Sequence, residues 1–136
     1  MSYNVYTVES LGTPNHEAIY IETNPDAPPQ SHSGSLYHVT GTILNGMIYD
    51  PRATEDPGLL PEHVPGSKRK IAIIRPDALD RFEKECCLAI PPPKPQVRLN
   101  GARLDPGKPL YRCGEWLRDV MDLAFEKGIF ESAMEK

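Results

Sequence analysis

The sequence lacks the features that mark several large classes of protein. It has only three cysteines in 136 residues, and two of them, Cys86 and Cys87, are adjacent, which argues against a framework of disulfides. No apolar run approaches the roughly 18 residues of a membrane-spanning helix. The first residues lack the basic and then apolar layout of a signal peptide. We therefore expect a cytoplasmic protein without an integral membrane segment.

Positive charge is also scarce. The chain has 15 Lys and Arg against 19 Asp and Glu, a formal net charge of −4. Its longest basic cluster, residues 68–70, is too short to follow a phosphate backbone, so we expect no nucleic-acid partner. It contains no phosphate loop and no dinucleotide fingerprint, and we expect no cofactor. A metal site built from Cys86, Cys87 and a histidine is the weaker interpretation, because no Cys-x₂-Cys spacing exists.

The chain is instead rich in proline, and its pattern predicts an α+β fold. Its 15 prolines are about twice the usual share, which indicates long loops between short elements. The length suits one domain over residues 1–136, with a frayed tail at 131–136. Strands are predicted at 4–9, 17–21, 36–43, 46–50 and 70–75, with helices at 76–88 and 113–127. Loops are predicted at 23–34 and 51–67, and Asn45-Gly46 indicates a tight hairpin. This order predicts an antiparallel sheet with helices packed at one side.

Cys113 is the strongest candidate for a chemical role. It directly precedes a clean amphipathic helix that buries Trp116, Leu117 and Val120. A cysteine at a helix N-terminus lies at the positive end of the macrodipole, which favours thiolate over thiol. We therefore expect a nucleophile with a lowered pKa. Cys86 and Cys87 are more simply explained as small buried residues at the end of the preceding helix.

A thiol nucleophile needs a base, and two of the four histidines lie on predicted strands. His16 opens the strand at 17–21, and His38 lies inside the strand at 36–43, whereas His32 and His63 fall in loops. If the two strands pair, His16 and His38 can project from one edge or face. The helix could then bring Cys113 against them. The alternative is that both histidines are structural, which spacing by itself does not decide.

Three short blocks resemble circularly permuted papain-like proteins, the group that contains lecithin retinol acyltransferase-like enzymes. The blocks are His16-Glu17-Ala18-Ile19-Tyr20-Ile21, Gly34-Ser35-Leu36-Tyr37-His38-Val39-Thr40-Gly41 and Arg112-Cys113-Gly114-Glu115-Trp116. They follow one another in the permuted order His, His, Cys. The chain is also similar to small fungal proteins of unassigned function that share the LYHV and RCxEW blocks. The resemblance covers roughly residues 3–130.

This resemblance implies a permuted papain-like fold and a cysteine-dependent hydrolase or acyltransferase. Cys113 would be the nucleophile, His16 the general base, and His38 the residue that orients the imidazole. The implied substrate is an ester or amide of a small or lipid-like molecule, which reacts through a thioester. We predict that Tyr20, Tyr37 and Trp116 contact it.

Two other functions remain open from the sequence. One is a non-catalytic module that binds a ligand or protein in the same cleft. The other is a cyclase or isomerase of a secondary-metabolite pathway, in which the cleft positions the substrate and His16 transfers a proton.

Overall fold

The computed structural model describes residues 2–12 and 15–132, and its largest element is a six-stranded sheet. The strand order is β6-β3-β2-β1-β7-β8, and every neighbouring pair is antiparallel. The bounds are β1 (Tyr3–Ser10), β2 (His16–Glu22), β3 (Gly34–Tyr37), β6 (Arg52–Thr54), β7 (Arg69–Ile74) and β8 (Phe130–Ser132). A separate hairpin pairs β4 (Val39–Thr42) with β5 (Gly46–Tyr49).

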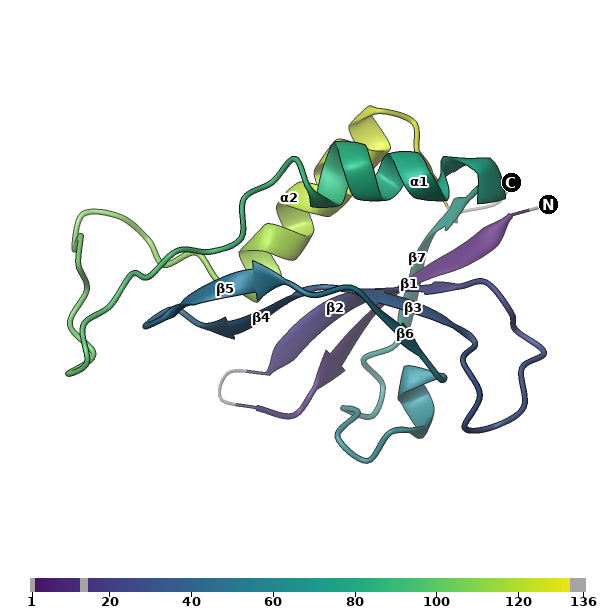
Figure 1. Cartoon of the computed structure of the whole chain (residues 1–136), viewed down its shortest axis with the longest axis horizontal. Helices are drawn as coiled ribbons and strands as arrows, with labels where there is room; N and C mark the ends of the chain where they lie inside the picture. Colours follow the sequence, from purple (N-terminus) through teal and green to yellow (C-terminus); the bar gives the residue numbers. More distant parts are fainter. Residues whose placement is uncertain (1, 13–14, 133–136) are drawn as a thin grey trace.

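The longer helical segments cover one face of this sheet and leave the other face without a helical layer (Figure 1). After β7 the chain forms one mixed helical segment, namely η2 (Pro76–Ala78), α1 (Leu79–Phe82) and the π-helical η3 (Glu83–Cys87). The long helix α2 (Cys113–Glu126) packs across β2. The short 3₁₀ turn η1 (Pro57–Leu59) precedes β7. This confirms the predicted α+β class, with a large antiparallel sheet and helices at one side.

Alternation along β2 divides the sheet into two apolar layers. Ile19 and Ile21 face α2 and are fully buried with Trp116 and Val120 in the main core. Ala18 belongs to a smaller cluster on the opposite face, because successive strand residues point to opposite sides. The same alternation gives His16 the parity of Ala18. The side chain of His16, the candidate base, therefore lies on the uncovered face at the start of β2.

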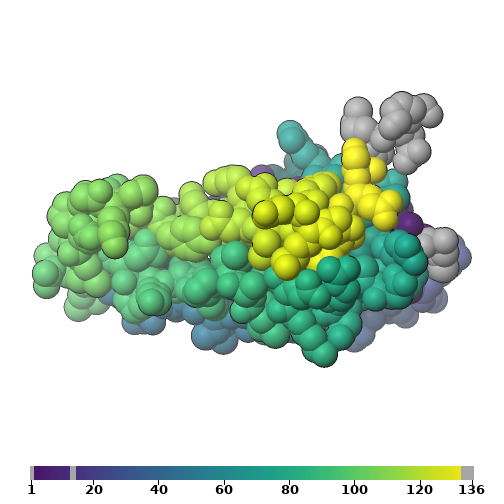
Figure 2. Space-filling model, turned by 90° about the horizontal axis from the view of Figure 1, so that it is seen from above, coloured from purple at the N-terminus to yellow at the C-terminus, as the bar shows by residue number. Residues whose placement is uncertain are grey.

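A proline-rich segment leaves the body between η3 and α2. Residues 93–111, which we call the arm, extend to one side as a narrow projection (Figure 1), and Figure 2 shows the same projection in green. Two hydrogen bonds fix its root to the β4–β5 hairpin: Met47 N–H donates to the Pro93 carbonyl at 2.8 Å, and Gln96 N–H to the Ile43 carbonyl at 2.6 Å. The arm thus begins beside the hairpin and returns to the first turn of α2.

Most predicted elements are present, but the prediction of one strand over 36–43 was wrong. The chain breaks at His38: β3 ends at Tyr37 in the main sheet, and β4 begins at Val39 in the separate hairpin. Neither glycine nor proline stands next to His38, so the break has no local signal. It arises because β3 pairs with β2 only up to Ile19↔Tyr37, after which the chain changes sheets.

Three other predictions required correction. The loop predicted over 51–67 contains β6 and η1, because the exposed segment 52–54 pairs with β3 as an edge strand. The helix predicted over 76–88 is mixed 3₁₀, α and π in character. The predicted frayed tail begins too early, since residues 131 and 132 pair with β7 in β8, while 133–136 lie outside the described residues. Within residues 2–12 and 15–132, no helix has both the length and the apolar composition needed to cross a bilayer.

Candidate functional site

Pairing of β2 with β3 brings His16 and His38 together. His16 is the first residue of β2, and His38 directly follows β3. The Nε2 atom of His16 lies 2.7 Å from Nδ1 of His38, and the two rings meet edge to face with centroids 4.8 Å apart. The bond takes up Nε2 of His16. Its Nδ1 atom has no hydrogen-bond partner among the described residues and is the nitrogen left to act on a substrate or a thiol.

Burial favours the neutral form of both imidazoles. Burial lowers the pKa of His38 to about 4, with the neighbouring His16 adding to the effect, and the Asp50 carboxylate and backbone partly oppose it. Burial also lowers the pKa of His16, and the Arg52 guanidinium contributes in the same direction. A neutral imidazole keeps a lone pair, so the pair is suited to accept a proton rather than to donate one at rest.

His38 is the more deeply placed member of the pair. Only 5% of it is exposed, and its backbone carbonyl accepts the N–H of Asp50 at 2.9 Å. Its Nε2 atom is buried without a hydrogen-bond partner among the described residues. Because a buried polar atom without a partner is costly, His38 is held there by packing and by His16 rather than by a full set of hydrogen bonds. Its position behind His16 fits a residue that orients the imidazole.

Cys113 is the first residue of α2 and is 7% exposed. The backbone N–H groups of Glu17 and Gly114 approach its thiol closely enough to act as hydrogen-bond donors that lower its pKa. Burial acts in the opposite direction and is the larger effect, and the nearby Glu17 carboxylate reinforces it, so the pKa of Cys113 is raised. The prediction of a lowered pKa was therefore wrong. The helix dipole is present, but desolvation of the sulfur outweighs it.

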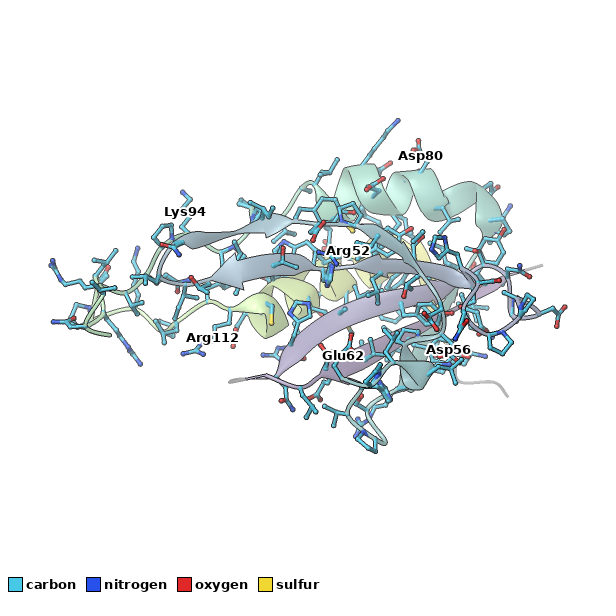
Figure 3. All side chains as sticks on the ribbon, turned by 60° about the horizontal axis from the view of Figure 1, so that its bottom comes forward. Arg52, Asp56, Glu62, Asp80, Lys94 and Arg112 are labelled. Atoms are coloured by element: carbon cyan, nitrogen blue, oxygen red, sulfur yellow. The ribbon has the colours of Figure 1, made fainter. Side chains whose placement is uncertain are left out.

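Cys113 and His16 line the same cavity. This cavity, of about 230 Å³, is called the thiol cavity, and it lies between the start of β2, the β4–β5 hairpin and the first turn of α2. Its lining residues are Asn15, His16, Gly41, Thr42, Ile43, Met47, Arg112 and Cys113. Arg112 lies beside the first turn of α2 in Figure 3. The predicted nucleophile and base thus line one cavity, and the second histidine is hydrogen-bonded to the base.

A second cavity lies on the uncovered face of the sheet. It measures about 270 Å³, and we call it the open-face cavity. His16, His38 and Arg52 line it together with an apolar floor that includes Ala18 and Leu36. Arg52 lies over the middle of this face in Figure 3 and pairs with Asp50 at 2.6 Å. His16 therefore borders both cavities.

The three aromatic residues predicted to contact substrate lie elsewhere. Trp116 is fully buried, and its indole N–H donates to the Ile90 carbonyl at 3.0 Å. Tyr20 is fully buried on the opposite side of the sheet, where its hydroxyl bonds to Ser33. Tyr37 packs edge-on against Phe82 with centroids 5.1 Å apart. None of the three lines the thiol cavity or the open-face cavity.

Glu17 is a site residue that the sequence analysis missed. Its side chain occupies the space beside Gly114, where a Cβ would lie 3.2 Å from the carboxylate carbon and closer still to one of its oxygens. The helix start thus accommodates this carboxylate because residue 114 has no side chain. A glycine directly after a candidate nucleophile at a helix start is the signal that could have indicated such a close approach.

The remaining candidates show no comparable arrangement. Cys86 and Cys87 are buried in the core, and burial raises the pKa of Cys86 to about 11 and that of Cys87 further. His63 lines the open-face cavity, and His32 is exposed in its loop. In the part of the chain that the structure describes, no group of three or more His, Cys, Asp or Glu side chains could hold a metal ion.

Comparison with known proteins identifies a family but no function. Neither the curated proteins nor the solved structures include a significant match. Residues 3–131 match a family of unknown function, DUF6540, which spans nearly the whole chain and both cavities. The chain therefore belongs to the DUF6540 family.

Proposed function

We propose that this protein is a cysteine-dependent hydrolase or acyltransferase that acts on an ester or amide, with a circularly permuted papain-like arrangement. One observation carries the proposal: His16, which is hydrogen-bonded to His38, lines the same cavity as Cys113 at the start of α2. A nucleophile, a base and a residue that orients the base are the minimum for thiol catalysis. The order of the three residues in the chain agrees with the resemblance to permuted papain-like proteins.

The first step is deprotonation of the thiol by neutral His16. We assign the proton between the two rings to Nε2 of His16, which donates it to Nδ1 of His38 at 2.7 Å. Nδ1 of His16 then has a lone pair to accept the Cys113 proton. Because burial keeps the thiol protonated at rest, the proton moves to His16 as sulfur attacks the substrate carbonyl carbon, and no thiolate is stored beforehand. His38 keeps the ring of His16 in the productive tautomer and orientation.

The attack forms a carbon–sulfur bond and places a negative charge on the former carbonyl oxygen. The first N–H groups of α2 have no acceptor within the helix, and together with the macrodipole they suit an oxyanion there. Collapse of this intermediate breaks the bond to the alcohol or amine, which leaves with the proton held by His16. Water or a second alcohol or amine then attacks the thioester, again through His16, and restores the Cys113 thiol.

The test is acylation by a small activated ester. The full chain is incubated with p-nitrophenyl acetate, release of nitrophenolate is followed, and the acetylated peptide is identified by mass spectrometry. We expect acetyl transfer to Cys113 and none to Cys86, which is fully buried. His16→Gln should slow acylation by about 10²–10⁴-fold, the usual contribution of a general base. His32→Gln, a matched change at an exposed histidine, should leave the rate unchanged.

The experiment can also contradict the proposal. Acetylation that His16→Gln does not slow, or that falls on lysines and spares Cys113, would mean that the two residues do not work together. Cys113→Ser separates the chemistry from the fold, since the smaller hydroxyl fits the same buried position.

A non-catalytic binding module is the second candidate, and the burial of Cys113 favours it. A cysteine residue that is 7% exposed, with a raised thiol pKa, is also typical of a structural cysteine. In that case the thiol cavity would hold a ligand without reacting with it. A Cys113→Ser variant that binds the ester as tightly as the unchanged chain, when neither protein converts it, would support this function instead.

A further inference from the structure

The arm carries positive charge in a chain that is acidic overall. Between residues 93 and 111 there are four Lys or Arg and one Asp, whereas the whole chain has 15 Lys and Arg against 19 Asp and Glu. The cations are Lys94, Arg98, Arg103 and Lys108, and all four are exposed. The arm is therefore a basic projection on an acidic body.

Most of these cations are not neutralised within the molecule. Lys108 lies 3.8 Å from Asp105, the one carboxylate in the arm. Lys94, Arg98 and Arg103 form no ion pair with any residue that the structure describes. Cations on the body are commonly paired, as in the bridges of Arg52 with Asp50 and Arg81 with Glu85. Unpaired charges on a projection are available to an external anionic surface.

The tip of the arm is a defined turn with an apolar apex. Arg98 N–H donates to the Ala102 carbonyl at 2.7 Å, and Gly101 N–H donates to the Arg98 carbonyl at 2.8 Å. Gly101 has a φ of +88°, a conformation that glycine adopts without strain. Leu99 lies within this turn and is 89% exposed, and Leu104 follows it at 49%. Two exposed leucines thus lie directly after Arg98 and Arg103.

The root of the arm fixes the direction in which the tip points. Backbone hydrogen bonds tie it to the β4–β5 hairpin. The Gln96 side-chain amide also donates to the Tyr111 carbonyl and accepts the Tyr111 N–H, both at 2.6 Å, where the arm returns to the body. Ile43 and Met47 at this root also line the thiol cavity. The arm therefore extends from the edge of the cavity and presents its tip beyond the body (Figures 1 and 2).

We propose that the arm docks on an anionic lipid bilayer, with Leu99 entering the interface and Arg98 and Arg103 contacting the headgroups. The shape and chemistry favour this occupant over an acidic protein or a nucleic acid. A narrow convex tip fits a flat, yielding surface, and an exposed leucine gains free energy in the apolar layer below the headgroups. Single-stranded nucleic acid would favour aromatic side chains at the tip, and the arm's one aromatic residue, Tyr111, lies at its root. The proposal does not depend on thiol chemistry at Cys113.

The test is co-sedimentation of the full chain with vesicles. One set contains phosphatidylcholine alone, and the other contains about 30% phosphatidylserine. We expect binding to the anionic vesicles, weakened when NaCl rises from about 0.1 M to about 0.5 M, because salt screens the surface potential. Neutral vesicles should bind far more weakly.

Paired variants locate the contact. Arg98→Gln with Arg103→Gln should weaken binding by about 25-fold, from about fivefold for each cation near an anionic membrane. The matched control is Arg69→Gln with Lys70→Gln, which removes the same charge from exposed positions in β7 and should have little effect. Leu99→Ser should weaken binding several-fold. Leu88→Ser, at a leucine of the body that is 60% exposed, should not.

Three results would overturn the proposal. The first is absence of binding to the anionic vesicles. The second is an equal loss in the arm and body variants, which would assign the attraction to net charge rather than to the arm. The third is that Leu99→Ser binds the anionic vesicles as well as the unchanged chain does, while poly-glutamate or duplex DNA also captures the chain. The partner would then be an acidic macromolecule. Each result leaves the acylation of Cys113 unaffected, so failure here and failure of the proposed enzyme activity are distinguishable.

Discussion

The contact between Glu17 and Gly114 leads to a prediction about stability that requires no assumption about function. Gly114 is the second residue of α2, and the Glu17 carboxylate occupies the space where a side chain at position 114 would begin. In Gly114→Ala the added methyl group would meet this carboxylate, with its carbon at 3.2 Å and one oxygen nearer. Ordinary contact begins at 3.4 Å, so the carboxylate must move by about 1 Å or rotate away.

Two effects of similar size then oppose each other. Replacing glycine by alanine in a helix stabilises it by up to about 1 kcal/mol. Moving a carboxylate away from a helix N-terminus costs about 0.3–1 kcal/mol, to which the crowding of Glu17 adds. We therefore expect Gly114→Ala to leave the free energy of unfolding nearly unchanged or slightly lower. With Glu17→Ala already present, the same change should raise it by up to about 1 kcal/mol.

A double-mutant cycle measures the difference. The unfolding of the unchanged chain, the two single variants and the double variant is followed by circular dichroism in urea. The expected coupling free energy is about 1 kcal/mol, in the direction that makes alanine at position 114 more favourable once Glu17 is removed. If Gly114→Ala has the same effect in both backgrounds, within about 0.3 kcal/mol, the carboxylate does not lie against the helix start and the description of the site is wrong.

Three further predictions follow from the same structure. The rate of Cys113 alkylation by iodoacetamide should rise with pH, with an inflection above the ordinary cysteine pKa of about 8.5, because burial keeps the thiol protonated. A rate that is constant between about pH 5 and 7 would instead indicate a preformed thiolate–imidazolium pair. The free energy of unfolding should fall as pH falls from 6.5 to about 4, because unfolded His38 takes up a proton that the folded residue does not. In urea titrations His38→Asn should reduce this pH dependence, and an unchanged dependence would contradict the burial of His38. Gly34→Ala should destabilise the fold by about 2 kcal/mol or more, because its Cβ would collide with the Ile21 carbonyl oxygen, which is backbone and cannot rotate away; a thermal melt within about 1 °C of the unchanged chain would refute this.

The raised pKa of Cys113 distinguishes two kinds of thiol chemistry. A cysteine at a helix N-terminus is predicted to be a thiolate at rest, and this prediction needs only the sequence. The structure adds burial at 7% exposure and the Glu17 carboxylate, and both favour the neutral thiol. If the site is catalytic, His16 must remove the proton during the attack. The rate should then depend on His16 more strongly than it would for a preformed ion pair.

Local patterns predicted much of the fold. The strands at 4–9, 17–21 and 70–75 and the helix from Cys113 are present within about one or two residues of the predicted bounds. These segments have strong periodicity or clear end signals, such as the glycine after the last turn of α2, where Gly128 has a φ of +73°. The edge strand β6 was missed because an exposed strand of three residues has no apolar alternation to detect.

The sequence by itself determined the three chemical groups and the order in which they occur along the chain. It contains a cysteine at a helix start and two histidines in segments predicted as strands, and each has a local signal. Only the tertiary structure decided that His38 leaves the main sheet and bonds to His16 at 2.7 Å, and that both cavities meet at His16. It also decided that the Cys113 thiol is neutral. The physical reason is that sheet register, burial and the approach of the Glu17 carboxylate are set by contacts between segments far apart in the chain, which local propensity does not encode.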